Sequence, residues 1–328
     1  MSYSKTEIDA VITWVDGNDT THRKKRLKVL REKDLEKDSV LTGSDNTRFI
    51  DNGELQYCIK SIRKFAPWIQ NIYLVTDNQV PEFLTPRVKE KYNVSIIDHR
   101  EIFESYEWAL PSFNSRSIES MLHRIPNLSD QFIYFNDDFV LTKPVSQDEF
   151  FVDGKVVLRG RWQKATNYNK LRINLNNLVS YIAKNLLGIT RSMHLLFQIK
   201  SAQTAGFDDV YYRSPHVPHP IKRMTLQKFF DENNSLFEEN IQYQFRNKKQ
   251  FSAIYLANHL EIKKGNAELR KANDAIMVNG EMDMSLVLKR KLKKISDQKV
   301  KFVCLQAIDK LNEDKVARIE KTLNKQLK

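Results

Sequence analysis

The sequence has few cysteines and no long apolar run, and each shortage excludes a class of protein. Its 328 residues include only two cysteines, Cys58 and Cys304, too few for a disulfide framework, a zinc finger or an iron–sulfur site. No stretch approaches the roughly 20 consecutive apolar residues that cross a bilayer. The N-terminal residues lack the basic segment and apolar run of a secretion signal. We therefore expect a globular, cytoplasmic protein without a transmembrane anchor.

Glycine is also scarce, which limits how a nucleotide could be held. The chain has nine glycines and contains neither the G-x-x-x-x-G-K nor the G-x-G-x-x-G loop that cradles phosphates with backbone N–H groups. A bound nucleotide would therefore be held by side chains and a metal ion. The G-x-S-x-G turn is absent too, which argues against a serine hydrolase of the α/β type.

Positive charge, in contrast, is in excess. The chain has 53 Lys and Arg against 41 Asp and Glu, a net charge of +12. Three kinds of partner would suit this excess: nucleic acid, a membrane surface, or a phosphorylated molecule or polymer. The basic clusters at 22–26 and 289–294 lack the interleaved aromatic residues of a single-strand-binding groove, and each could be a solvated helix face. We expect no nucleic-acid partner.

Hydrophobic patterning predicts an α/β protein. Apolar, strand-like runs at 8–15, 72–76, 94–97 and 132–135 alternate with amphipathic helices predicted at 52–66 and 115–125. This alternation favours a Rossmann-like, mostly parallel sheet covered on both faces. Residues 20–47 are charged and turn-rich, with a short amphipathic piece near Leu27 and Leu30.

The second half of the chain has a different pattern. Helical periodicity dominates from about 170 to 265, a late strand is predicted at 300–305, and a final helix begins near Glu313. We place a boundary at residue 155. Residues 1–155 form the α/β half, and residues 156–328 form a mainly helical half with a basic C-terminal tail that completes the same cleft.

Acidic residues follow the predicted strands. The first strand leads into Asp16 and Asp19, the second into Asp77, and the fourth into Asp137 and Asp138. Ligands bind beyond the carboxyl ends of strands in open parallel sheets. Adjacent carboxylates such as Asp137 and Asp138 suit a divalent cation, Mg²⁺ or Mn²⁺, that bridges phosphate oxygens. The alternative is that these are ordinary turn residues.

Histidines supply the other candidates. His216 and His219 lie three residues apart in a Pro-restrained loop, where one could act as a general base. Glu119 and His123 lie at i and i+4 on the 115–125 helix, which is also the spacing of a plain intrahelical pair. Arg246 stands in a mixed polar stretch that by default lies on the surface.

Four blocks of the sequence resemble the Stealth family of sugar-phosphate transferases, in order over about residues 8–250. The first block is Asp9–Asp19, and the fourth combines His216–His219 with Arg246. The second block comprises Arg48–Leu55, Ser61–Trp68 and Asn71–Asp77. The third comprises Leu110–Phe113, Ile118–Ser120, His123–Ile125 and Phe132–Asp138.

The resemblance implies an activity and its partners. Members of the family transfer a hexose-1-phosphate or N-acetylhexosamine-1-phosphate from a nucleotide-sugar, usually a UDP-sugar, to a hydroxyl of a glycan. They form a phosphodiester and release UMP. This compact chain is most similar to the bacterial type, which serves capsular, exo- or receptor polysaccharide synthesis. The acceptor would be an oligosaccharide or polysaccharide, either free or lipid-linked. The enzyme would work in the cytoplasm, either in solution or at the inner face of the membrane as a peripheral protein.

The resemblance also suggests roles for single residues. His216 would be the base, with Asp137 or Asp138 as the alternative, and Arg246 would neutralise phosphate charge. The substrate-binding candidates, which we expect near the nucleotide or the sugar, are Asp9, Trp14, Asp16, Asp19, Arg48, Asn52, Glu119 and His123. Two rival functions remain open: a conventional glycosyltransferase that releases UDP, and a basic module that only binds polyanions.

Overall fold

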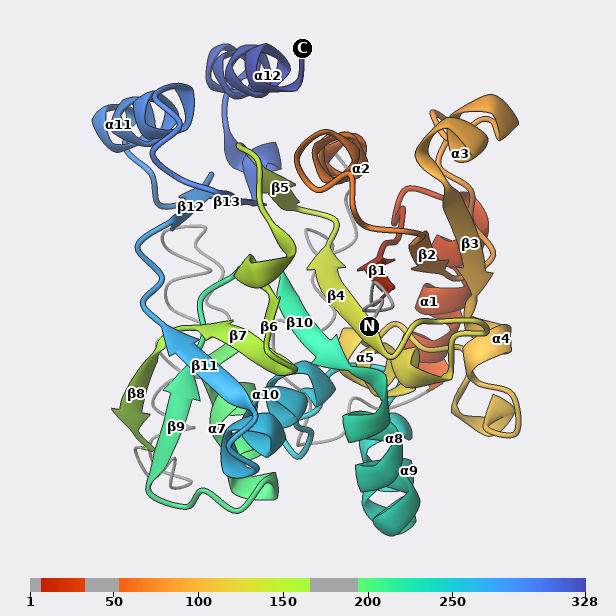
Figure 1. Cartoon of the computed structure of the whole chain (residues 1–328). Helices are drawn as coiled ribbons and strands as arrows, with labels where there is room; N and C mark the ends of the chain where they lie inside the picture. Colours follow the sequence, from red (N-terminus) through yellow and green to blue (C-terminus); the bar gives the residue numbers. More distant parts are fainter. Residues whose placement is uncertain (1–6, 33–52, 166–193) are drawn as a thin grey trace.

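The computed structural model of the chain describes residues 7–32, 53–165 and 194–328 (Figure 1). The strands are β1 (Ile8–Thr13), β2 (Ile72–Thr76), β3 (Val94–Asp98), β4 (Gln131–Asn136), β5 (Phe139–Leu141), β6 (Phe151–Val152), β7 (Lys155–Arg159), β8 (Arg161–Lys164), β9 (Val210–Arg213), β10 (His219–Lys222), β11 (Ala267–Arg270), β12 (Ala275–Asn279) and β13 (Phe302–Gln306). The helices are α1 (Thr20–Glu32), α2 (Glu54–Phe65), α3 (Pro86–Tyr92), α4 (His99–Ile102), α5 (Ser115–Met121), α7 (His194–Thr204), α8 (Arg223–Glu232), α9 (Asn234–Ile241), α10 (Ala253–Lys263), α11 (Ser285–Ser296) and α12 (Glu313–Leu327).

The central sheet is mostly parallel, as the alternation of strands and helices predicted. Its five strands lie in the order β10-β4-β1-β2-β3. β1, β2, β3 and β4 run parallel, and β10 joins the edge of β4 antiparallel. The prediction of an α/β fold with a mostly parallel sheet is confirmed.

The side chains of the central strands alternate between two cores, because successive residues of a strand point to opposite faces. In β1, Ala10 and Ile12 pack on the face covered by α2, whereas Val11 packs on the face covered by α5 and α10. Burial on both faces explains why these strands are almost continuously apolar in sequence. In β1, β2 and β4 most polar residues therefore lie near the strand ends.

The second half of the chain contributes strands as well as helices. β10 extends the central sheet, β11 pairs with β7, and β13 pairs with β5. Strands from both sides of residue 155 therefore share sheets. The predicted strand near 300–305 and the helix from Glu313 are present as β13 and α12.

Two other predicted elements differ in extent. The 20–47 segment begins with a 13-residue helix, α1, whereas its remainder from residue 33 lies outside the described residues. The predicted 115–125 helix ends at Met121 and continues as a 3₁₀ turn at Leu122–Arg124. In the part of the chain that the structure describes, no helix combines the length and the apolar character needed to span a bilayer.

Candidate active site

The carboxyl ends of the parallel strands meet at one edge of the central sheet. Thr13, at the end of β1, lies opposite Val75 of β2 and Asn136 of β4. Because β10 runs the other way, its first residue, His219, lies opposite Tyr134 near the same edge. The fourth sequence block is thus brought next to the first and the third.

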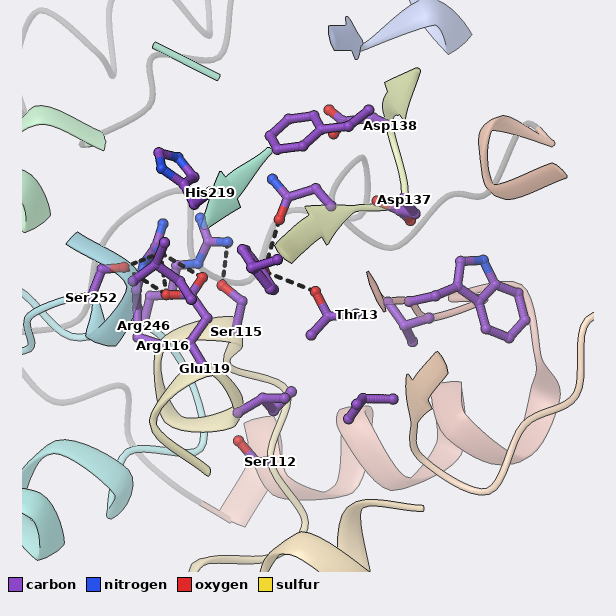
Figure 2. A pocket seen from close by; sticks show the side chains of 18 of the residues that line it. Thr13, Ser112, Ser115, Arg116, Glu119, Asp137, Asp138, His219, Arg246 and Ser252 are labelled. Atoms are coloured by element: carbon purple, nitrogen blue, oxygen red, sulfur yellow. Dashed lines mark hydrogen bonds and ion pairs between the residues drawn. The ribbon is translucent and has the colours of Figure 1, made fainter. Parts of the chain in front are cut away.

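A cavity of about 210 Å³ opens at this edge, and Figure 2 shows its lining. The lining includes four predicted site residues: Asp137 and Asp138 from the acidic turn, and His216 and Arg246 from the fourth block. Trp14 and Glu119 line it too. Side chains distant in sequence therefore converge on one space.

Three histidines form a group in this lining. The rings of His194 and His216 stack with their centroids 4.2 Å apart, and His194 Nε2 is 2.6 Å from the hydroxyl of Tyr255. His219 is 5% exposed, and its Nδ1 is 3.3 Å from Nδ2 of Asn258. The sequence analysis missed His194 and Tyr255, because neither lies in a pattern that distinguishes it from an ordinary helical residue.

Burial controls the protonation of these histidines. Desolvation, and then the nearby Arg116 and Arg213, lower the pKa of His216 to about 4. Burial and the neighbouring His216 lower the pKa of His219 to about 3. Both imidazoles are therefore neutral near pH 7, which is the state in which a base can accept a proton.

Two arginines of the lining have different partners. Arg116 Nη1 donates to both carboxylate oxygens of Glu119 at 2.6 and 2.7 Å, and Ser252 Oγ donates to Glu119 Oε2 at 2.7 Å. Arg246 Nη2 donates to Ser115 Oγ at 2.7 Å. Figure 2 shows these groups on one side of the cavity, across from Asp137 and Asp138.

Of the two arginines, only Arg116 has its charge compensated by an acidic side chain that the structure describes. Glu119 neutralises Arg116 within a buried ion pair. Arg246, in contrast, forms no ion pair with any acidic side chain that the structure describes, and among those residues it donates to the neutral hydroxyl of Ser115. Arg246 is therefore the lining residue best suited to receive a phosphate group with its fixed set of donors.

The acidic side of the cavity is formed by the turn between β4 and β5. Burial raises the pKa of Asp138 to about 7; a hydrogen bond from the thiol of Cys304 opposes this shift, and the nearby Glu54 adds to it. Cys304 Sγ lies 3.3 Å from Asp138 Oδ2. Asp138 Oδ1 is buried and has no hydrogen-bond partner among the described residues. A buried carboxylate oxygen without a donor is a site that a cation could satisfy.

The described residues do not supply a complete metal site by themselves. They contain no group of three or more His, Cys, Asp or Glu side chains arranged to hold an ion. Mg²⁺, however, is commonly bound by one or two carboxylates together with substrate phosphates and water. Asp137 and Asp138 fit that smaller requirement.

Four of the predicted substrate-binding residues that the structure describes lie outside the cavity lining, namely Asp9, Asp16, Asp19 and His123. The expectation for Asp9 is wrong: it lies at the start of β1, at the opposite edge from the cavity. Its fully buried carboxylate accepts from the backbone N–H of Asn71 at 3.0 Å and of Ser129 at 2.8 Å, and from Asn71 Nδ2 at 2.9 Å. Asp19 Oδ1 instead accepts from the His22 N–H at 2.6 Å and so caps α1. Asp16 Oδ1 accepts from the backbone N–H of Asn18 at 2.8 Å within the same turn.

The remaining predicted residues have other positions. His123 does not lie at i+4 to Glu119 on a continuous helix, because the helix tightens into a 3₁₀ turn after Met121. Its ring packs against Phe230 and Phe237 in the core, with centroids 5.5 and 6.0 Å away. Arg48 and Asn52 lie outside the described residues.

Comparison with known proteins supports the resemblance found in the sequence. Residues 6–34 match the model of Stealth protein CR1, conserved region 1, and residues 48–158 match that of CR2, conserved region 2. The chain is 30% identical to the receptor polysaccharide phosphotransferase WefC of Streptococcus oralis, over 79% of each protein. It is 32% identical to the capsular polysaccharide phosphotransferase fcs1 of Haemophilus influenzae, over 75% of this chain and 62% of that protein.

Other similarities are shorter or more distant. The chain is 43% identical to the capsular polysaccharide phosphotransferase LcbA of Neisseria meningitidis over 45% of its own length and 38% of that protein. The chain thus spans less than two thirds of the length of several of these relatives. The galactosyltransferase LgtC aligns in structure with a TM-score of 0.44 and 12% identity, over 97% of this chain and 95% of that chain. The matches to both conserved regions, and the similarity to WefC over most of both proteins, show that this chain belongs to the Stealth family.

Proposed function

We propose that this protein is a phosphotransferase that moves a sugar-1-phosphate from a UDP-sugar to a hydroxyl of a glycan and forms a phosphodiester. The observation that carries this proposal is the convergence of His216, Arg246 and the Asp137–Asp138 pair on one cavity. The names of its relatives agree with this reaction class. The product would be a bacterial capsular, exo- or receptor polysaccharide, made at a cytoplasmic location.

The reaction places distinct demands on the cavity. The acceptor oxygen attacks the phosphorus that carries the sugar, the bond from that phosphorus to the UMP oxygen breaks, and UMP leaves with the bonding electron pair. The acceptor hydroxyl must lose its proton, and the equatorial phosphate oxygens need positive charge near them. Positioning and electrostatics supply most of the catalysis in phosphoryl transfer.

His216 fits the role of the base. Its ring lines the cavity, and its lowered pKa keeps it neutral near pH 7 and able to accept the acceptor proton. Stacking against His194 fixes the ring plane, while His194 is itself held by Tyr255. Binding of the anionic donor would raise the pKa of His216 and make it a stronger base.

Arg246 fits the role of the phosphate ligand. Its guanidinium is held by Ser115, yet no carboxylate among the described residues neutralises it. Arg116, by contrast, would act on substrates mainly by holding Glu119 in place beside Ser252. Glu119 would then be available to accept a hydrogen bond from a sugar hydroxyl.

Asp137 and Asp138 would hold a divalent cation, Mg²⁺ or Mn²⁺. When bound, such an ion supplies positive charge to the diphosphate and stabilises the leaving UMP. A carboxyl group with a pKa near 7, such as Asp138, binds a cation only after losing its proton. We therefore expect chelation with EDTA to abolish turnover and added Mg²⁺ or Mn²⁺ to restore it. Full turnover in excess chelator would show that arginine alone carries the phosphate charge.

Identification of the released nucleotide tests the reaction itself. The protein is incubated with a panel of UDP-sugars and glycan acceptors, and the nucleotide products are separated by chromatography. Release of UMP with a phosphodiester in the product supports the proposal. Release of UDP would show a conventional glycosyltransferase, and acceptor binding without turnover of any donor would favour a polyanion-binding module.

A further inference from the structure

We propose that α11 and the loop before it form a docking surface for an anionic phospholipid bilayer. The inference rests on the exposure and charge of residues 282–294 and is independent of the proposed reaction. Figure 1 shows α11 beside α12 at the outer edge of the molecule, where α11 covers the small β12-β13-β5 sheet.

The two faces of α11 have opposite character. Leu288, Leu292 and Ile295 recur at i, i+4 and i+7 and are buried in the core beneath the helix. The outer face starts at Leu286 and continues with basic residues at i+3, i+4 and i+7, namely Lys289, Arg290 and Lys293. All three basic side chains are exposed and form no ion pair with any described residue. The same holds for Lys294.

The loop before α11 and the first turn of the helix expose large apolar side chains. The exposed fractions are 68% for Met282, 74% for Met284 and 71% for Leu286. They are the three highest values among the large hydrophobic residues that the structure describes; the next is 63% at Val80. Three such side chains within five residues are a local apolar cluster, which water does not favour.

The surroundings add positive charge to this edge. α12 packs against both α11 and α2, and α3 packs against α2. Together the four helices contain 15 Lys and Arg against 5 Asp and Glu, so they carry +10 of the net charge of +12. The acidic Asp283 near the loop is already paired with Lys291 at 2.6 Å.

The combination of features selects the partner. A soluble anionic polymer would explain the basic residues but would gain little from three exposed apolar side chains. A bilayer with anionic headgroups uses both, because Met and Leu enter the headgroup–acyl boundary while Lys and Arg stay at the surface.

Sedimentation with lipid vesicles tests the proposal. The full chain is mixed with vesicles of phosphatidylglycerol and phosphatidylcholine, or of phosphatidylcholine alone, and the bound fraction is measured. We expect binding only to the anionic vesicles, and release as the salt concentration rises. Equal binding to both, or none to either, would overturn the proposal.

Two triple variants identify the surface. Each Lys or Arg near an anionic bilayer contributes about fivefold to the partition coefficient, so K289E/R290E/K293E should lower it by roughly 100-fold or more. M282S/M284S/L286S keeps the charge. It should lower the partition coefficient by about 10-fold or more, because each methylene buried in the bilayer also contributes to binding. If only the charge reversal weakened binding, the surface would be an electrostatic polyanion site instead of a bilayer anchor.

A matched control separates local from global charge. K24E/K28E/R31E makes the same charge change on exposed positions of α1, and V80S/W108S removes exposed apolar side chains elsewhere. Both should bind vesicles like the wild type. A control that lost as much binding as the α11 variants would show that α11 is not the docking surface. Thermal melts confirm that every variant is folded, as expected for exposed side chains.

Discussion

Replacement of His216 by alanine separates catalysis from packing. His216 faces the cavity and is half-buried, whereas His219, three residues later, is 5% exposed and lies in the sheet. General bases contribute about 10²–10⁴-fold to turnover. Because the pKa of His216 is lowered to about 4, it is a weak base in the free protein, and we expect a loss near the lower end, about 10²-fold.

The loss corresponds to about 3 kcal/mol of activation free energy. Affinity for the UDP-sugar should survive, because the base acts on the acceptor hydroxyl and not on the nucleotide. H219A is the comparison. Its buried ring contacts Tyr255 and Asn258, so its loss should leave a cavity and lower the free energy of unfolding by about 2 kcal/mol or more.

The assay measures turnover, donor affinity and thermal melting for both variants. A folded H216A protein that works near the wild-type rate would refute the role of His216 and move the base to Asp137 or Asp138. If both variants lost stability and activity to the same degree, the histidines would serve packing alone. H216Q is a further control, since it keeps a polar side chain of similar size but cannot accept a proton from the acceptor.

Three other outcomes follow from the contacts described above. R246A should reduce both turnover and donor affinity, and R246K should restore only part of each because lysine lacks the planar set of donors; unchanged donor affinity in titrations with UDP-sugar would contradict the phosphate role. D9A should lower the free energy of unfolding by about 1–3 kcal/mol, because two partly buried backbone N–H groups lose their acceptor, yet leave donor affinity unchanged. All seven histidines have lowered pKa values in the folded protein, so the unfolded chain takes up more protons below about pH 6.5 and stability should fall as the pH drops toward 4. Urea denaturation midpoints measured at about pH 7 and about pH 5 check this last expectation, which a constant midpoint would contradict.

The central sheet could be predicted from sequence because burial on both faces leaves a strong local signal. β1, β2 and β4 are almost continuously apolar, and polar residues appear where each strand ends. Parallel strands must bring those ends together, so the meeting of Thr13 with Asn136 follows from pattern alone. The sequence does not predict that β10 joins this sheet. A four-residue antiparallel edge strand that contains a proline has no comparable run of apolar residues.

The errors at the site have local causes. Asp9 belongs to the first block, but its place at the beginning of β1 puts it at the edge of the sheet opposite the cavity. The i, i+4 spacing of Glu119 and His123 places the two side chains together only if the predicted 115–125 helix is continuous. Glu119 instead forms an ion pair with Arg116, three residues earlier, and His123 lies in the 3₁₀ turn at Leu122–Arg124 that follows the helix. Periodicity does not reveal where a helix tightens.

The basic clusters at 22–26 and 289–294 show that charge in a sequence does not reveal which side chains are buried and which are exposed. In α1, His22 lines the cavity, Arg26 is buried and Lys25 pairs with Asp77 at 3.2 Å, so this cluster partly turns inward. In α11, the buried stripe is wholly apolar and nearly all the charge points outward. The two segments have similar composition, and the difference lies in the phase of their apolar residues relative to the core. That phase assigns α1 to the neighbourhood of the reaction and leaves α11 available to a partner outside the molecule.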